Sequence, residues 1–152
     1  MKKIIIFILC LIPWFVASLV PFNKEFYDSL ILPFFTPPNI FYVIAWTITY
    51  ILIAISIYLI IENNTWKKVQ KSYKISLLTN YLFNQSFQFV FFLFENTFLG
   101  FISCLGTFIS SLFLYEETTN ENEASAKYLN FYVLLSLFAT ILSATIYIIN
   151  AK

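Results

Sequence analysis

The sequence predicts an all-α membrane protein, a single domain built as a bundle of five transmembrane helices. Of its 152 residues, 60% are hydrophobic and only 11% are charged, whereas a soluble domain has about 25% charged residues. So few charges cannot cover a surface that faces water. Apolar residues also follow one another without alternation, as in Ile51–Ile55, which excludes the in-and-out pattern of a membrane β-barrel strand.

Five stretches are long and apolar enough to span a bilayer, which takes about 20 residues. They cover residues 4–20, 39–61, 73–94, 97–115 and 128–150. The first stretch follows Lys2 and Lys3 and also resembles a cleaved signal peptide, with Val16-Ala17-Ser18 as the cleavage site. We favour a retained helix, because its apolar run is longer than the usual core of a signal peptide.

The segment between the first two spans, residues 21–38, is expected to form a lid over one end of the bundle. It contains four prolines, which lower the cost of ordering a loop, and five aromatic residues. We expect Thr36 to cap the second span, with Pro37 in its first turn.

The distribution of lysine predicts the orientation. With five spans, the amino terminus shares one side with residues 62–72 and 116–127. That side holds seven of the nine lysines when Lys74, just inside the third span, is included. The amino terminus is therefore predicted to be cytoplasmic. Residues 116–127 carry four glutamates and are expected to form a flexible, solvated loop.

The third span carries amide side chains at membrane depth. Asn80, Asn84 and Gln88 are four residues apart, which places them on one helical face, and Gln85 widens that face. Buried amides are costly in hydrocarbon, so they face other helices or a cavity. The stripe could bind a carbonyl or carboxylate of a ligand, or it could join neighbouring helices.

Small residues recur on the fourth span, where Gly106 and Ser110 are four apart, as are Ser103 and Thr107. Such spacing allows close helix approach, either within the chain or across a dimer.

The low charge also argues against nucleic-acid binding. The absence of His excludes Ser-His-Asp chemistry and His-ligated metals, and we predict no catalytic residue, metal or cofactor.

Four sequence motifs resemble those of the tryptophan-rich sensory protein family, also called the translocator protein or peripheral benzodiazepine receptor family. They occur in family order across nearly the whole chain. They are Phe26–Leu30 with Pro33–Pro38, Trp46–Tyr50, Asn80–Phe87, and Phe138–Ser143 followed by Ile146, Tyr147 and Asn150.

This resemblance implies a homodimer of five-helix bundles with a hydrophobic ligand pocket beneath the first loop. Family members bind porphyrins and isoquinoline-carboxamide or benzodiazepine ligands, and some bind sterols. By the same resemblance, Trp46 and Asn84 would donate hydrogen bonds to a ligand carbonyl. The candidate ligand-binding residues are Trp46, Asn84, Gln85, Gln88, Ala139, Phe26, Phe35, Tyr50, Asn80 and Leu135.

The chain departs from the family pattern in its tryptophans, of which it has three. Phe26, Phe35, Leu135 and Ala144 stand where the family usually has Trp. Neither Phe nor Leu can act as an indole donor. We therefore expect a receptor or sensor that binds tetrapyrrole-like ligands. A transporter of the same ligands, a light-dependent porphyrin-degrading enzyme and a structural subunit are the alternatives.

Overall fold

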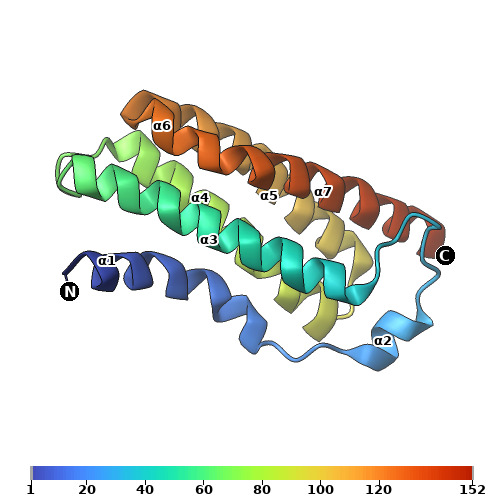
Figure 1. The fold of residues 1–152 in the computed structure, drawn as a ribbon. Coiled ribbons are helices and arrows are strands. Elements are labelled where there is room, and N and C mark those ends of the chain that lie inside the picture. The colour runs from blue at the N-terminus through green and yellow to red at the C-terminus, as the bar shows by residue number, and fades with distance from the viewer. Residues whose placement is uncertain (1, 152) are drawn as a thin grey trace.

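The computed structural model describes residues 2–151, and the described chain is helical without any strand (Figure 1). The all-helical class predicted from the sequence is therefore confirmed for these residues. The elements are α1 (Lys2–Leu11), η1 (Ile12–Leu19), α2 (Lys24–Ser29), α3 (Asn39–Asn63), α4 (Lys71–Phe87), η2 (Gln88–Leu93), α5 (Thr97–Glu121), α6 (Glu123–Ala126), η3 (Lys127–Leu129) and α7 (Asn130–Asn150).

Three helical segments are long and apolar enough to cross a membrane. They are α3, α5 and the continuous run from Glu123 to Asn150. The segment before α2 changes from α-helix to 3₁₀-helix next to Pro13, which has no amide to continue the α-helical ladder. The segment that contains α4 has 17 α-helical residues and continues as the short π-helix η2. Its lysines and amides lower its hydropathy.

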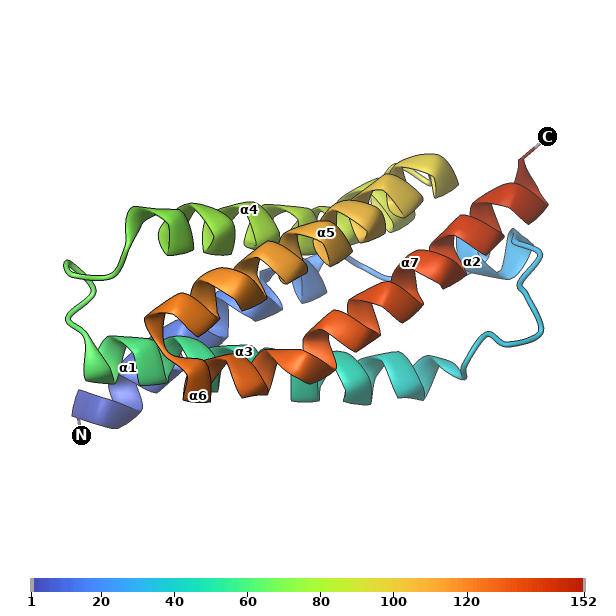
Figure 2. The same cartoon turned by 90° about the horizontal axis from the view of Figure 1, so that it is seen from above.

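α5 lies between α4 and α7 and packs closely against both (Figure 2). The small residues of the fourth predicted span make this possible. A Cβ atom on Gly106 would lie 2.3 Å from the ring of Phe83 on α4, and one on Gly100 would lie 2.5 Å from the ring of Phe91. The small residues are therefore used for packing within the chain.

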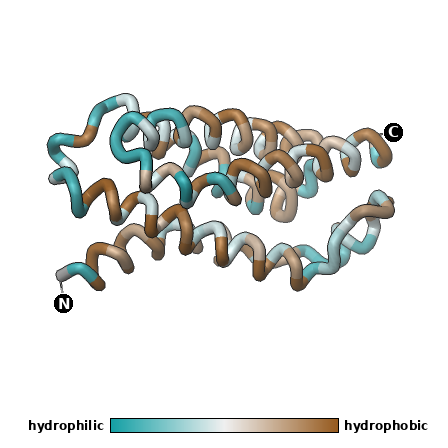
Figure 3. The backbone as a smooth tube through the Cα atoms, turned by 45° about the horizontal axis from the view of Figure 1, so that its top comes forward, coloured by the Kyte–Doolittle hydropathy of each residue, from teal (hydrophilic) through white to brown (hydrophobic). Residues whose placement is uncertain are grey.

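α3 packs mainly against α1 and against the α6–η3 region, with fewer contacts to α7. The described N-terminal end, the α3–α4 loop and α6 lie at one end of the array, whereas α2 and the C-terminal end of α7 lie at the other (Figure 1). Hydrophobic residues follow the helices, and hydrophilic residues gather in the connections at both ends (Figure 3).

Two expectations about the connections are wrong. Residues 116–121 continue α5 and residues 123–126 form α6, where the sequence predicted a flexible loop. Thr118 is completely buried there. Thr36 does not cap α3, because its hydroxyl donates to the carbonyl of Pro33 at 2.7 Å. Pro38 occupies the N-cap position without a side-chain cap.

Candidate functional site

Three amide side chains of α4 are buried in the middle of the array. Asn80, Asn84 and Gln85 are exposed by 0%, 6% and 6%, respectively. Gln88 is half-buried and begins η2. The first three lie on one α-helical face, as the spacing requires. Gln88 falls where the helix changes to π-type hydrogen bonding.

Asn80 and Asn84 belong to a hydrogen-bond network that joins four helices. The Tyr132 hydroxyl on α7 donates to Asn80 Oδ1 at 2.8 Å, and Asn84 Nδ2 lies 3.4 Å from the same hydroxyl. The Tyr50 hydroxyl on α3 donates to Asn84 Oδ1 at 3.1 Å. Asn80 Nδ2 donates to α5, at 3.2 Å to the Thr107 carbonyl and 3.0 Å to the Ser110 hydroxyl. The network thus links α3, α4, α5 and α7.

Gln85 extends the network to η1. Its Oε1 accepts the backbone N–H of Ala17 at 2.7 Å, and its Nε2 donates to the Trp14 carbonyl at 3.2 Å. The same nitrogen lies 3.1 Å from Asn84 Oδ1. One side chain therefore satisfies two backbone groups of a 3₁₀ segment and fixes η1 against α4.

Aromatic rings surround this network. The Trp46 ring centroid lies 5.7 Å from that of Tyr50 and 6.3 Å from that of Tyr132. The Trp14 ring lies 5.9 Å from Tyr50 and 5.4 Å from Tyr81. Few directional polar groups within a mostly apolar and aromatic environment are typical of small-molecule sites.

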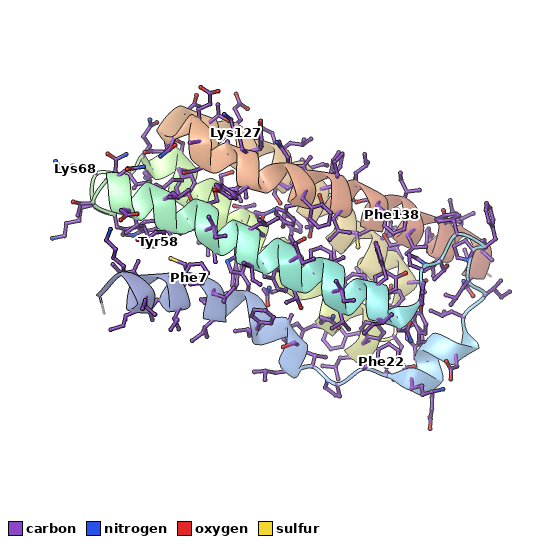
Figure 4. The ribbon with its side chains drawn as sticks, in the orientation of Figure 1. Phe7, Phe22, Tyr58, Lys68, Lys127 and Phe138 are labelled. Carbon is purple, nitrogen blue, oxygen red and sulfur yellow. The ribbon has the colours of Figure 1, made fainter. Side chains whose placement is uncertain are left out.

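The segment 21–38 contacts a separate aromatic cluster at the far end of the array. Phe26, Phe35 and Tyr27 pack around the buried side chains of Phe91 and Phe92 and of two aliphatic residues of α7, Leu142 and Ile146. Partial burial raises the pKa of the Tyr27 phenol above its ordinary value. Figure 4 shows Phe22 near this end and Lys68 at the opposite end.

Two side-chain contacts hold this segment to the helix ends. Asn23 caps α2 by accepting the Phe26 N–H at 3.0 Å, and its Nδ2 donates to Glu95 Oε1 at 2.8 Å. At the end of α7, Asn150 pairs with the Ile31 backbone through two bonds of 2.9 Å, one accepted and one donated. The segment is therefore fixed both to the α4–α5 turn and to α7.

The structure brings together only part of the predicted ligand-binding set. Trp46, Tyr50, Asn80, Asn84 and Gln85 lie around one network. The other predicted residues lie elsewhere, with Phe26 and Phe35 in the end cluster, Leu135 buried on α7, and Gln88 and Ala139 half-buried.

Sequence reasoning missed two central residues, Tyr132 and Trp14. Tyr132 is completely buried, and Trp14 is 2% exposed. Tyr132 begins a run of buried α7 positions at helical spacing, with Leu135, Ser136 and Ser143, and this periodicity could have identified it. Trp14 lies in a segment that is uniformly apolar, so no periodic signal distinguishes it.

Residues 2–151 contain no group of three acidic, Cys or His side chains that could hold a metal ion.

Comparison with known proteins gives the decisive observation on family. A sequence model described as TspO/MBR family matches residues 5–148. The chain belongs to the TspO/MBR family. With the three long apolar helices, membership of this family makes the protein an integral membrane protein.

Curated relatives agree with membership of the TspO/MBR family. The chain is 39% identical to the tryptophan-rich protein TspO of Bacillus cereus, over 99% of each chain. It is 31% identical to the tryptophan-rich protein TspO of Archaeoglobus fulgidus, over 84% of this chain and 82% of the relative. It is also 33% identical to the uncharacterized membrane protein YtaB of Bacillus subtilis, over 87% of this chain and 84% of the relative.

Proposed function

We propose that this TspO/MBR family protein is a membrane receptor or sensor that binds a flat hydrophobic ligand of the porphyrin type inside the helix bundle. The observation that carries the proposal is the buried network of Tyr50, Asn84, Tyr132 and Asn80 among aromatic rings. Rings supply apolar contact with a flat ligand, and the amides supply directional hydrogen bonds. Isoquinoline carboxamides and sterols belong to the same proposed ligand range.

Ligand binding requires the amides to exchange partners, because in this conformation they bond to neighbouring helices. Asn84 Nδ2 is the best placed group for this exchange, since its 3.4 Å contact with Tyr132 is the longest in the network. The half-buried Trp46 indole lies beside this network, against the rings of Tyr50 and Tyr132. We propose that both groups donate to a ligand carbonyl or carboxylate.

The remaining parts of the proposal concern topology and assembly. We propose five membrane spans, with α1–η1 and α4–η2 as the two interrupted ones. The amino terminus faces the cytoplasm of a bacterial-type cell, and the protein forms a homodimer. The uneven distribution of lysine along the chain supports this orientation.

The test is a titration of the purified protein in detergent with protoporphyrin IX, followed through the Soret band. Asn84→Ala should weaken binding by about 1–3 kcal/mol, or about 5- to 150-fold, because a buried partner is left unpaired. Trp46→Phe keeps an aromatic ring but removes the indole N–H donor, and it should also weaken binding.

Asn130→Ala is the matched control, because Asn130 is an exposed asparagine at the start of α7. It should leave the affinity unchanged. Equal affinity in the wild type, Asn84→Ala and Trp46→Phe would contradict the assigned roles.

The alternative functions predict different results in related assays. A transporter would give saturable porphyrin flux in reconstituted vesicles. A porphyrin-degrading enzyme would lose the Soret band under illumination faster than a protein-free control. A structural subunit without a ligand would show no rise in melting temperature with porphyrin, whereas a receptor should show one by mass action.

A further inference from the structure

We propose that a groove on the outside of the array binds one acyl chain of an anionic phospholipid, with the headgroup phosphate at Lys74. The groove encloses about 440 Å³ between α1–η1, α3 and α4. The proposal depends on the chain being an integral membrane protein and is independent of the proposed receptor function.

The groove follows the helix axes. One wall is a stripe of α4, in which Lys74, Leu78 and Tyr81 recur at helical spacing. Seven residues of α-helix extend about 10 Å, so the stripe leads from the charged end of α4 toward the middle of the array. The lining residues on the other segments are apolar or weakly polar. They are Leu9, Cys10, Pro13 and Trp14 on α1–η1, Ile57 and Ile61 on α3, and Trp66 in the loop between α3 and α4.

Among the residues that the structure describes, Lys74 is the one charged residue that lines the groove. Its Nζ lies 5.2 Å from the centroid of the Trp66 ring, which holds the ammonium group at the loop end of the groove by a cation–π contact. Three further lysines, Lys67, Lys68 and Lys71, are exposed beside it in the sequence. Figure 4 shows Lys68 at this end of the array.

These positive charges have no carboxylate partner among residues 2–151, where the ion pairs are Lys3–Glu62 and Lys24–Asp28. Two carboxylates of α5 lie near the start of α4 and accept hydrogen bonds from neutral groups. Glu117 accepts the Ser72 hydroxyl, and Glu121 accepts the backbone N–H of Gln70. Basic pockets between membrane helices at the end of a span bind anionic lipid headgroups.

The combination of an apolar channel with a cation at one end selects a phospholipid over other occupants. A free anion would leave the apolar wall unused, and a neutral lipid would leave Lys74 and its neighbours without a partner. Leu9 and Leu78 on the two walls are 65% and 58% exposed, so an acyl chain can reach both from the surrounding bilayer.

The first experiment measures lipid retention by native mass spectrometry of the detergent-solubilised protein, titrated with phosphatidylglycerol or phosphatidylcholine. The wild type should retain phosphatidylglycerol in preference to phosphatidylcholine. Lys74→Gln should weaken phosphatidylglycerol binding about fivefold, which corresponds to about 1 kcal/mol for a lysine near the headgroups. The matched control Lys127→Gln, in η3 outside the groove, should change it little.

The second experiment fills the groove. Leu78→Trp should reduce the binding of phosphatidylglycerol, whereas Leu82→Trp, one turn further along α4 and outside the groove, should not. Leu78 and Leu82 are both 58% exposed, so an equal loss in the two variants would identify general annular lipid and overturn the proposal. Inorganic phosphate should compete only weakly, and full competition by millimolar phosphate would also overturn it.

A third measurement needs no variant. Phosphatidylglycerol should slow the reaction of Cys10 with a maleimide, because Cys10 lines the groove, whereas the buried Cys104 in α5 should stay unreactive with and without the lipid. An unchanged rate at Cys10, or protection by self-association of the protein in the absence of lipid, would refute lipid occupancy.

Discussion

Replacement of Gln85 by Met tests whether one side chain positions η1. Met keeps the approximate size of Gln but cannot form the bonds of 2.7 Å to the Ala17 N–H and 3.2 Å to the Trp14 carbonyl. Gln85 is 6% exposed, so water has little access to replace these bonds.

The expected loss of stability follows from these two bonds. Interhelical hydrogen bonds in membranes average about 0.6 kcal/mol, which gives about 1 kcal/mol for the pair. The Ala17 N–H loses its side-chain acceptor in a buried position, and an unsatisfied buried group costs about 1–3 kcal/mol. We therefore expect Gln85→Met to lower the free energy of unfolding by about 1–3 kcal/mol.

The assay combines thermal unfolding in detergent with hydrogen–deuterium exchange of the η1 amides. The Ala17 amide should exchange faster in Gln85→Met than in the wild type, whereas the amides of α5 should not change. Gln88→Met is the control, because Gln88 is half-buried and begins η2. Unchanged protection of Ala17 would refute the claim that Gln85 fixes η1.

Substitutions at three further positions test the packing of α5 and the two contacts that hold residues 21–38. Gly106→Ala should lower the free energy of unfolding by about 1–3 kcal/mol, because the added Cβ would lie 2.3 Å from the ring of Phe83 on α4. An unchanged melting temperature would contradict this. Asn150→Ala removes both bonds to the Ile31 backbone, so limited proteolysis should cut residues 21–38 faster, and equal rates would exclude this role. Glu95 has a φ of 51°, so Glu95→Val should destabilise by about 1 kcal/mol, whereas Glu95→Gly should keep or raise the melting temperature despite the lost bond to Asn23.

Hydropathy was sufficient to predict the positions of most helices, because lipid forces apolar segments into helices. The predicted span 39–61 corresponds to α3, which ends at Asn63, and the predicted start at Thr97 agrees with α5. Hydropathy carries no information on the type of backbone hydrogen bonding. The change to 3₁₀ geometry near Pro13 and the π-helix at Gln88–Leu93 were therefore not predicted.

The extent of α5 shows a second limit of the sequence analysis. Charged residues signal the membrane boundary but not the end of a helix, since Glu is a good helix former. The contacts of Glu117 and Glu121 with the start of α4 are long-range and have no local signature.

For the site, the spacing of Asn80 and Asn84 was enough to predict a shared polar face on α4. The partners of that face could not be predicted, because they come from distant helices. Tyr132 is 52 residues from Asn80 in the sequence, and only the packing of α7 beside α5 brings its hydroxyl to the amide. The interpretation of the amides as links between helices describes their contacts in this conformation, and their role toward a ligand stays a prediction.

The pairing of Asn150 with Ile31 has a practical consequence for protein engineering. A purification tag or fluorescent fusion added after α7 would be attached next to the contact that anchors the 21–38 segment. A fusion at the amino terminus would lie at the opposite end of the molecule (Figure 1). Protein prepared for ligand-binding measurements should therefore carry its tag at the amino terminus.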